Sequence, residues 1–256
     1  MALRRLRAVA RLVRAVGHGL HGLAIVLFRF PRLATAQRLA RIRWWSRKMV
    51  HLLGIELRVE GTPLASGGLL AVNHISWLDI MVVHALVPEA RFVSKADVKA
   101  WPLISRLVDS AGTLYLERER KRDALRVVHA MAEALAAGQT VAIFPEGTTS
   151  TGHGLLPFHA NLLQAAISTA TPVQPVALRF ADSSHAVSEA MEFVGATSLL
   201  RSLWQTSCGE GVRVRLVFLP PRPSAHVDRR ELAALLRADI AGALGIDPDA
   251  APAPSA

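Results

Sequence analysis

The chain has 256 residues, of which 51% are hydrophobic, and its mean hydropathy is +0.30. This composition excludes a disordered polymer, and the length allows one large domain with a small appendage. The 30 basic residues exceed the 20 acidic ones, so the formal net charge is +10, which indicates a polyanionic partner: nucleic acid, an anionic membrane or a phosphorylated substrate. The single cysteine, Cys208, excludes an intramolecular disulfide framework and a metal site built from several cysteines, and it suits a reducing compartment.

The positive charge is concentrated at the N-terminus. Twelve basic residues and no acidic residue precede Glu56. From Leu52 onward, 18 basic residues stand against 20 acidic ones, so the remainder of the chain is close to neutral. The polyanion signal therefore belongs to residues 1–53.

The start of this segment has the pattern of a basic amphipathic helix. At about 100° per residue, four arginines fall in one arc and four aliphatic side chains in the opposite arc, with Arg5 alone among the apolar positions. A helix of this kind lies in the headgroup layer of an anionic membrane. The arginines are Arg4, Arg7, Arg11 and Arg14, and the aliphatic residues are Leu6, Val9, Val13 and Val16.

Two further stretches complete this segment. The apolar stretch 19–30 is too short to span a bilayer core of about 30 Å, and Pro31 interrupts it. The stretch 34–53 is basic again and carries Trp44 and Trp45, which is typical of a helix at the boundary of lipid and water. We therefore predict that residues 1–53 form a membrane-associated pair of amphipathic helices.

Two other interpretations fit part of this pattern. A DNA-binding arm is also basic, but it has little use for apolar stretches. A secretory signal peptide shares the basic start, the apolar stretch and the small residues 34–36. Against it, Arg29 and Arg32 fall in the wrong region, and further arginines follow the supposed cleavage point.

From residue 55 onward, short β-rich runs alternate with helical patterns. The clearest helical pattern ends at Gly138, and its apolar residues share one face. This alternation predicts an α/β domain over 54–246, with a mostly parallel sheet flanked by helices, followed by a disordered Pro/Ala-rich tail at 247–256. In such sheets, ligands bind at the carboxyl ends of the strands. Strands are predicted at 55–60, 68–73, 90–94, 112–116, 140–144, 172–179 and 212–219, and helices at 77–87, 98–110, 122–137, 159–169 and 229–244.

The predicted strand 68–73 runs directly into the sequence NHISWLD, residues 73–79. With His74 in the turn and Asp79 in the first turn of the next helix, the carboxylate can reach one imidazole nitrogen. Such a contact holds the ring in one tautomer, stabilises the imidazolium and leaves the other nitrogen free to take a proton. A plainer interpretation also fits, because Ser76 and Asp79 before an apolar run form a capping-box pattern.

Three more segments stand where predicted strands end or bend. GTLYLER (112–118) ends in Arg118, which can hold a phosphate bidentately or be a solvated surface charge. In FPEGTTS (144–150), the glycine permits close approach of a ligand, and the hydroxyl and amide groups can contact an anion or a polyol. VQPVA (173–177) places Pro175 inside an apolar strand, which indicates a bulge or a sheet edge.

In this order, the blocks N-H-x4-D, G-x4-E-R, F-P-E-G-T and V-x-P-V-A resemble those of the glycerolipid acyltransferases, and in particular the bacterial lysophosphatidate acyltransferases. The resemblance covers roughly residues 50–220 and includes FVSK (92–95) and LPFHAN (156–161). The basic helix pair resembles the membrane-associated helical motif of this family. Two positions depart from the family pattern: Thr149 stands where an arginine is frequent, and His159 where many members have a lysine.

The resemblance implies transfer of a fatty acyl group from acyl-CoA or acyl-carrier protein to the free hydroxyl of 1-acylglycerol-3-phosphate, giving phosphatidic acid for phospholipid synthesis. It implies no cofactor and no metal. His74 would be the general base, and Asp79 would orient it. The residues expected to bind the substrate or stabilise the oxyanion are Arg118, Glu146, Gly147, Thr148, Asn73, Ser76 and the backbone near Pro175.

The expected partners are the phospholipid surface of the membrane, the lysophospholipid acceptor and the acyl donor, with no nucleic acid. The expected location is the cytoplasmic face of the inner membrane, with peripheral or monotopic attachment. Another lysolipid, such as a lyso-aminolipid, is an alternative acceptor. A non-catalytic membrane-binding protein is the alternative from a different class, in which Asp79 only caps a helix and Arg118 is a surface charge.

Overall fold

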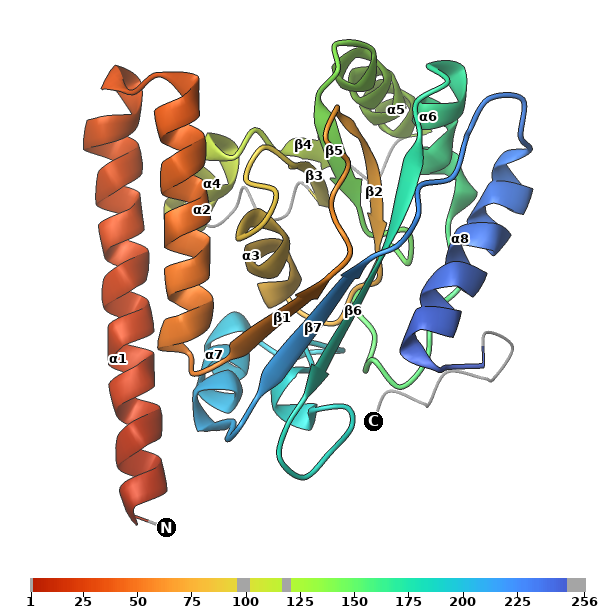
Figure 1. The fold of residues 1–256 in the computed structure, drawn as a ribbon. Coiled ribbons are helices and arrows are strands. Elements are labelled where there is room, and N and C mark those ends of the chain that lie inside the picture. The colour runs from red at the N-terminus through yellow and green to blue at the C-terminus, as the bar shows by residue number, and fades with distance from the viewer. Residues whose placement is uncertain (1, 96–101, 117–120, 248–256) are drawn as a thin grey trace.

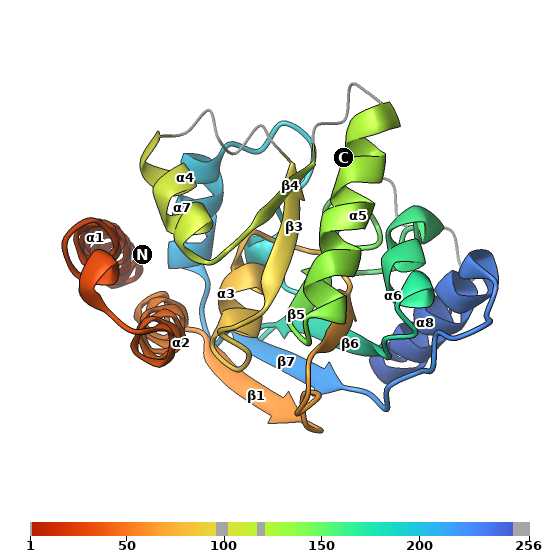
Figure 2. The ribbon, with the colours of Figure 1, turned by 90° about the horizontal axis from the view of Figure 1, so that it is seen from above.

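The computed structural model of the protein describes residues 2–95, 102–116 and 121–247. In this part of the chain, helices cover both faces of a seven-stranded sheet with the spatial order β1-β7-β6-β2-β5-β3-β4 (Figures 1 and 2). Neighbouring strands are parallel except for β6 and β7, so the predicted mostly parallel sheet is confirmed. The strands are β1 (Glu56–Glu60), β2 (Gly68–Val72), β3 (Arg91–Lys95), β4 (Leu114–Leu116), β5 (Thr140–Ile143), β6 (Val173–Ala181) and β7 (Arg213–Phe218).

The central strands are buried on both faces. All five residues of β2 and all four of β5 are buried, because parallel strands covered by helices on both sides need continuous apolar side chains. One apolar core joins the sheet to α2, α3 and the segment before α7, and two others join it to α5, α6 and α8. The helices after β2 are α3 (Leu78–His84), α4 (Pro102–Ser110), α5 (Lys121–Ala136), α6 (Gln164–Ser168), α7 (Leu199–Cys208) and α8 (Arg229–Leu244).

Helix α7 was not predicted from the sequence. Its apolar residues are interspersed with serine and threonine, and this dilutes the helical pattern. One local signal does mark its beginning, because the side chain of Ser198 accepts the N–H of Arg201 at 3.3 Å as an N-cap. The predicted tail lies outside the described residues except for Asp247.

The N-terminal segment forms two helices that lie side by side (Figures 1 and 2). Helix α1 (Ala2–Ala24) continues through a π-helical turn (Ile25–Arg29) and a 3-10 turn (Phe30–Arg32), and α2 follows at Thr35–Leu52. The helical structure thus ends at Arg32, one residue after Pro31, which is close to the predicted interruption. Pro31 lies in the first turn of the 3-10 helix, where its fixed φ is compatible with helical backbone. The resulting helix of 31 residues is long and apolar enough to cross a membrane, by length and composition alone.

The two helices approach closely at Gly22. A Cβ at this position would lie 2.3 Å from Nε1 of Trp45, so only glycine permits the contact. The indole N–H of Trp45 donates to the carbonyl of His18 at 3.0 Å, and Nε2 of His18 donates to the carbonyl of Trp45 at 2.9 Å. The two rings stack with their centroids 5.3 Å apart. These contacts join α1 to α2.

Helix α1 turns its arginine arc toward the domain and its apolar arc away from it. The buried face contains Ala8, Ala15 and His18, close in helical angle to Arg4 and Arg11. The opposite arc is open, with exposed fractions of 66% for Leu6, 64% for Val13 and 57% for Leu20. An amphipathic helix packed in this sense leaves a row of apolar side chains uncovered by the domain.

Pro175 lies in β6, which is an interior strand, so the expectation of a sheet edge is wrong. The predicted bulge lies in the chain opposite Pro175. Val176 pairs with Phe218 and Val173 with Arg222, so the opposite chain has one residue more than β6 between these two pairs. The carbonyl of Pro175 accepts the N–H of Leu219 at 3.0 Å. The hydrogen-bond ladder between β6 and β7 is thus irregular at Pro175, which has no backbone N–H to donate.

The buried side chain of Gln174 in β6 forms hydrogen bonds with the backbone that follows β1 and with the backbone that follows β7. Its carbonyl accepts the N–H of Leu64, and its amide donates to the carbonyls of Thr62 and Leu219. We expect Gln174→Leu to lower the free energy of unfolding by about 2–4 kcal/mol, because it leaves three partly buried backbone groups without hydrogen-bond partners. Urea unfolding measures the change. Gln164→Leu is the matched control, and an equal loss in both variants would contradict this role.

Candidate active site

The two loops that carry the motifs meet at one edge of the sheet. Strands β2 and β5 are parallel neighbours, so their carboxyl ends lie side by side. NHISWLD follows β2, and FPEGTTS follows β5. The structure therefore brings together segments that are about 70 residues apart at the position where α/β sheets bind ligands.

The imidazole of His74 contacts the carboxylate of Asp79. Nδ1 lies 2.8 Å from Oδ2, and Oδ2 also accepts the N–H groups of Ile75 at 2.7 Å and Ser76 at 2.9 Å. Asp79 is fully buried in the first turn of α3. The ring contact and the capping contact are therefore both present, since one carboxylate binds the imidazole and the backbone that leads into the helix.

The ring of His74 is held between the protein interior and the surface. It stacks on Phe144 with the centroids 3.7 Å apart and an angle of 10° between the planes, and Phe92 stacks behind Phe144. The side chain of His74 remains 17% exposed. Nδ1 is taken by Asp79, and the described residues give Nε2 no hydrogen-bond partner. This nitrogen is the one left to exchange a proton with a bound molecule.

The backbone of His74 is held by the loop that follows β5. Its N–H donates to Oε1 of Glu146 at 2.7 Å. Its carbonyl accepts the N–H of Ser150 at 2.8 Å and the Ser150 hydroxyl at 3.2 Å. The histidine is thus fixed at its ring and at both polar groups of its backbone.

Glu146 is buried, with an exposed fraction of 2%. Its second oxygen accepts the N–H of Leu156 at 2.9 Å, so each carboxylate oxygen binds a backbone donor. Burial raises the pKa of Glu146 to about 7; the N–H groups of His74 and Leu156 oppose this rise, and the carboxylate of Asp79 adds to it. The group therefore titrates near neutral pH.

The neighbouring residues of FPEGTTS differ in their access to a ligand. Gly147 has a φ of 68°, which favours glycine, and it is partly exposed. Thr148 is exposed. Thr149, which replaces the arginine that is frequent in the family, donates its hydroxyl to the carbonyl of Phe193. Of the two threonines, only Thr148 keeps its hydroxyl free for a ligand among the described residues.

Two other expected site residues, Asn73 and Pro175, lie outside this loop. The side chain of Asn73 is buried and pairs twice with Leu178, donating to its carbonyl at 2.9 Å and accepting its N–H at 2.7 Å. Its amide therefore extends the pairing of β2 with β6. Pro175 is buried within β6. Arg118 lies outside the described residues.

Several residues that support the site were not predicted. Phe144 and Ser150 lie within FPEGTTS, but the motif does not indicate their contacts with His74. Phe193 donates its N–H to the carbonyl of Ile75 at 3.2 Å, and the indole of Trp77 donates to the hydroxyl of Ser202 in α7 at 3.1 Å. No local pattern marks these contacts, because they depend on the placement of α7 and of the segment before it. Within residues 2–95, 102–116 and 121–247, no group of three or more His, Cys, Asp and Glu side chains is arranged to hold a metal ion.

Known proteins share both the sequence and the fold of this chain. The Acyltransferase family model matches residues 55–179. A lyso-ornithine lipid O-acyltransferase of Pseudomonas aeruginosa is 38% identical over 235 residues, which cover 90% of each chain. A 1-acyl-sn-glycerol-3-phosphate acyltransferase of Neisseria gonorrhoeae is 40% identical over 132 residues, which cover 52% of this chain and 51% of the relative.

A solved structure shows the same architecture at low sequence identity. The crystal structure of the 1-acyl-sn-glycerophosphate acyltransferase of Thermotoga maritima superposes with a TM-score of 0.73 and 20% identity, covering 94% of this chain and 96% of that one. The chain therefore belongs to the Acyltransferase family. Within it, the chain is an enzyme of the lysophospholipid acyltransferase group, which confirms the resemblance seen in the motifs.

The raised pKa of Glu146 predicts a pH-dependent contribution to stability. Between pH 4.5, the ordinary pKa, and about 7, the folded protein binds more protons at this group than the unfolded chain does. Its contribution to the free energy of unfolding therefore falls as pH rises through this window, by at most about 1.4 kcal/mol per pH unit.

We expect the free energy of unfolding of the wild type, minus that of Glu146→Gln, to decrease from pH 4.5 to 7. Above pH 7 this difference should stay constant. Urea unfolding at pH 4.5, 6, 7 and 8 measures it. Glu89→Gln, at an exposed carboxyl, sets the background. A difference that does not change across this window would contradict the titration of Glu146.

Proposed function

We propose that this protein transfers a fatty acyl group from the thioester of acyl-CoA or acyl-carrier protein to the hydroxyl of a lysolipid, with His74 as the general base. The observation that carries this proposal is the 2.8 Å contact between His74 and Asp79, which leaves Nε2 of a partly exposed ring without a partner among the described residues. The carboxyl ends of β2 and β5 supply the location.

The reaction needs one base that later acts as an acid. Nε2 of His74 takes the proton of the acceptor hydroxyl as its oxygen attacks the thioester carbonyl carbon, and a tetrahedral intermediate forms. When the carbon–sulfur bond breaks, the leaving thiolate receives that proton and departs as a thiol. Asp79 holds the ring in the tautomer that exposes the basic nitrogen and stabilises the imidazolium. The acceptor supplies the nucleophile.

Glu146 acts as a positioning residue in this proposal, because both of its oxygens bind backbone N–H groups. The carboxylate fixes the place of His74 and does not reach the substrate. Gly147 and Thr148 remain the candidates of the same loop for contact with the headgroup. The side chain of Asn73 donates to and accepts from the backbone of Leu178, so we assign it to the support of the sheet.

The first candidate acceptor is 1-acylglycerol-3-phosphate, and its product is phosphatidic acid. The four motifs and the 40% identity to the Neisseria enzyme over 132 residues support it. A phosphate at this site would depend on Arg118.

The second candidate acceptor is a lyso-ornithine lipid. It is supported by the 38% identity to the Pseudomonas enzyme along 90% of the chain. Thr149 also favours this acceptor. It stands where an arginine is frequent in the family, and its hydroxyl donates to the carbonyl of Phe193.

An acceptor panel tests this function. Purified protein is given radiolabelled acyl-CoA or acyl-carrier protein with lysophosphatidate, glycerol phosphate or lyso-ornithine lipid, and the labelled lipids are separated. We expect turnover with the first or the third acceptor, and we expect His74→Ala to lower kcat by about 10²–10⁴-fold, the usual contribution of a general base. His129→Ala, at an exposed histidine of α5, is the matched control. Near-full activity of His74→Ala would refute the proposed base.

We propose further that residues 1–53 are a membrane-associated segment and that the exposed apolar arc of α1 enters the membrane. The domain leaves Leu6, Val13 and Leu20 uncovered. Helix α2 exposes basic side chains and Trp44, the combination that suits an anionic interface. Residues 54–246 then form the acyltransferase domain at the cytoplasmic face of the inner membrane.

Charged substitutions on this arc test the membrane face. We expect Leu6→Glu combined with Val13→Glu to reduce flotation with vesicles of phosphatidylethanolamine and phosphatidylglycerol at least tenfold, because each change removes apolar burial and adds repulsion from anionic lipid. Leu235→Glu places the same charge at an exposed leucine of α8 and should float as the wild type does. Equal flotation of all variants would show that another surface binds the membrane.

A further inference from the structure

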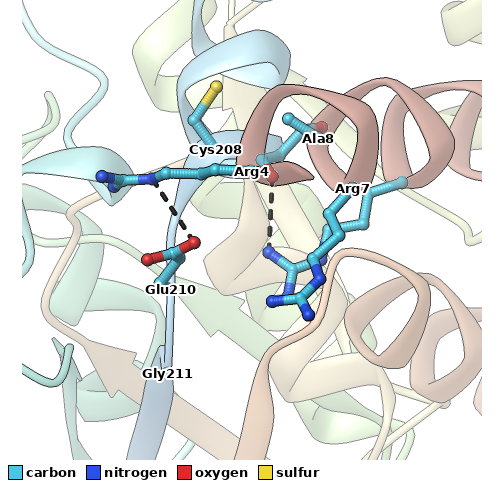
Figure 3. A pocket seen from close by; sticks show the side chains of 8 residues that line it. Arg4, Arg7, Ala8, Cys208, Glu210 and Gly211 are labelled. Carbon is cyan, nitrogen blue, oxygen red and sulfur yellow. Dashed lines mark hydrogen bonds and ion pairs between the residues drawn. The ribbon is translucent and has the colours of Figure 1, made fainter. Parts of the chain in front are cut away.

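A basic pocket lies between the N-terminal half of α1 and the end of α7 (Figure 3). Its volume is about 300 Å³, enough for a phosphate-bearing headgroup. None of its lining residues belongs to NHISWLD or FPEGTTS, so it is separate from the His74 site. Arg4, Arg7 and Arg11 line it from α1, and Ser207, Cys208 and Glu210 line it from the other side.

Arg11 joins α1 to α7. Its Nη1 donates to the carbonyls of Ser207, at 3.3 Å, and Gly209, which lie at the end of α7 where helical carbonyls lack partners. The guanidinium also packs over Gly54, where a Cβ would lie 2.5 Å from Cζ. This arginine is therefore already engaged and forms one wall of the pocket.

Arg4 and Arg7 are the cations that remain for a ligand. Nε of Arg4 lies 3.4 Å from Oε1 of Glu210, and the two side chains are 62% and 48% exposed (Figure 3). An exposed pair of this kind contributes little stability and opens easily. Arg7 is exposed and has no hydrogen bond or ion pair within the described residues. Three guanidinium groups against one carboxylate leave the pocket with a net positive charge of two, which attracts an anion.

The surroundings of the pocket select an amphiphile. Arginine forks bind the oxygens of a phosphate bidentately. Leu3 and Leu6 are exposed within one helical turn of Arg4 and Arg7, and the apolar arc continues from them through Val13. A headgroup between the two arginines thus has an apolar surface beside it for its acyl chains.

We propose that this pocket binds the phosphate of an anionic membrane phospholipid. The occupied site would hold α1 at the lipid surface through a defined headgroup, in addition to the apolar contact of the helix. The site does not depend on acyl transfer, so its test requires no turnover.

Cys208 provides a direct probe, because it lines the pocket and is the only cysteine of the chain. The rate at which a maleimide modifies Cys208 is measured with dihexanoyl phosphatidylglycerol below its micelle concentration. The same measurement is made with dihexanoyl phosphatidylcholine, glycerol phosphate and inorganic phosphate. We expect saturable slowing of the modification by phosphatidylglycerol and little effect of the zwitterionic lipid.

Three variants locate the effect. Arg4→Ala combined with Arg7→Ala should raise the half-saturating concentration of phosphatidylglycerol at least about tenfold, because it removes two charge-assisted contacts. Arg5→Ala combined with Arg14→Ala removes the same charge from exposed arginines of α1 outside the pocket, and it should change that concentration less than about threefold. Arg7→Glu alters a single exposed side chain without touching the Arg4–Glu210 pair and should also abolish protection.

Three results would overturn the proposal. Equal protection by glycerol phosphate or inorganic phosphate would identify free phosphate, and not a lipid, as the ligand. Equal weakening by the two double variants would show an effect of bulk charge. Full protection of Cys208 in Arg7→Glu would place the lipid elsewhere.

Discussion

The arrangement of this enzyme depends on the restraint of one histidine. Asp79 holds the ring of His74 through Nδ1, while Glu146 and Ser150 hold its N–H and its carbonyl. The ring contact is local, but the backbone contacts exist only because β5 lies beside β2. An imidazole held in this way keeps one nitrogen available and loses little freedom when a substrate binds, which is what positioning for proton transfer requires.

The segment before and within α7 connects the site to the N-terminal helices. Phe193 donates to the carbonyl of Ile75, and Ser202 accepts from Trp77, so this segment packs against the loop of His74. The end of α7 binds Arg11 of α1 through two carbonyls. The surface proposed to meet the membrane and the proposed catalytic loop therefore both contact this segment. An acceptor that enters from the lipid phase would meet the domain on the side that α1 and α7 form.

The sequence predicted the strands well because their signal is strong and local. β2 is a run of five buried residues that ends at a polar turn, and such a run is readable without knowledge of its neighbours. Helix α7 was missed because serine and threonine dilute its apolar pattern, and its position rests on contacts with α1. The edge inferred from Pro175 was wrong because a proline in an interior strand is accommodated by the irregular chain opposite, which no property of β6 itself reveals.

The sequence by itself placed Asp79 within reach of His74, because a turn followed by the start of a helix allows two residues at this spacing to meet. It also determined that α1 has an arginine arc and an apolar arc. Only the tertiary structure decided that Glu146, 72 residues further along the chain, binds the backbone of His74, and that the side chain of Asn73 pairs with Leu178, 105 residues away. It likewise decided that the arginine arc faces the domain. Spacing along the chain fixes which groups can meet within one turn, whereas strand order and helix packing fix which distant partners satisfy them.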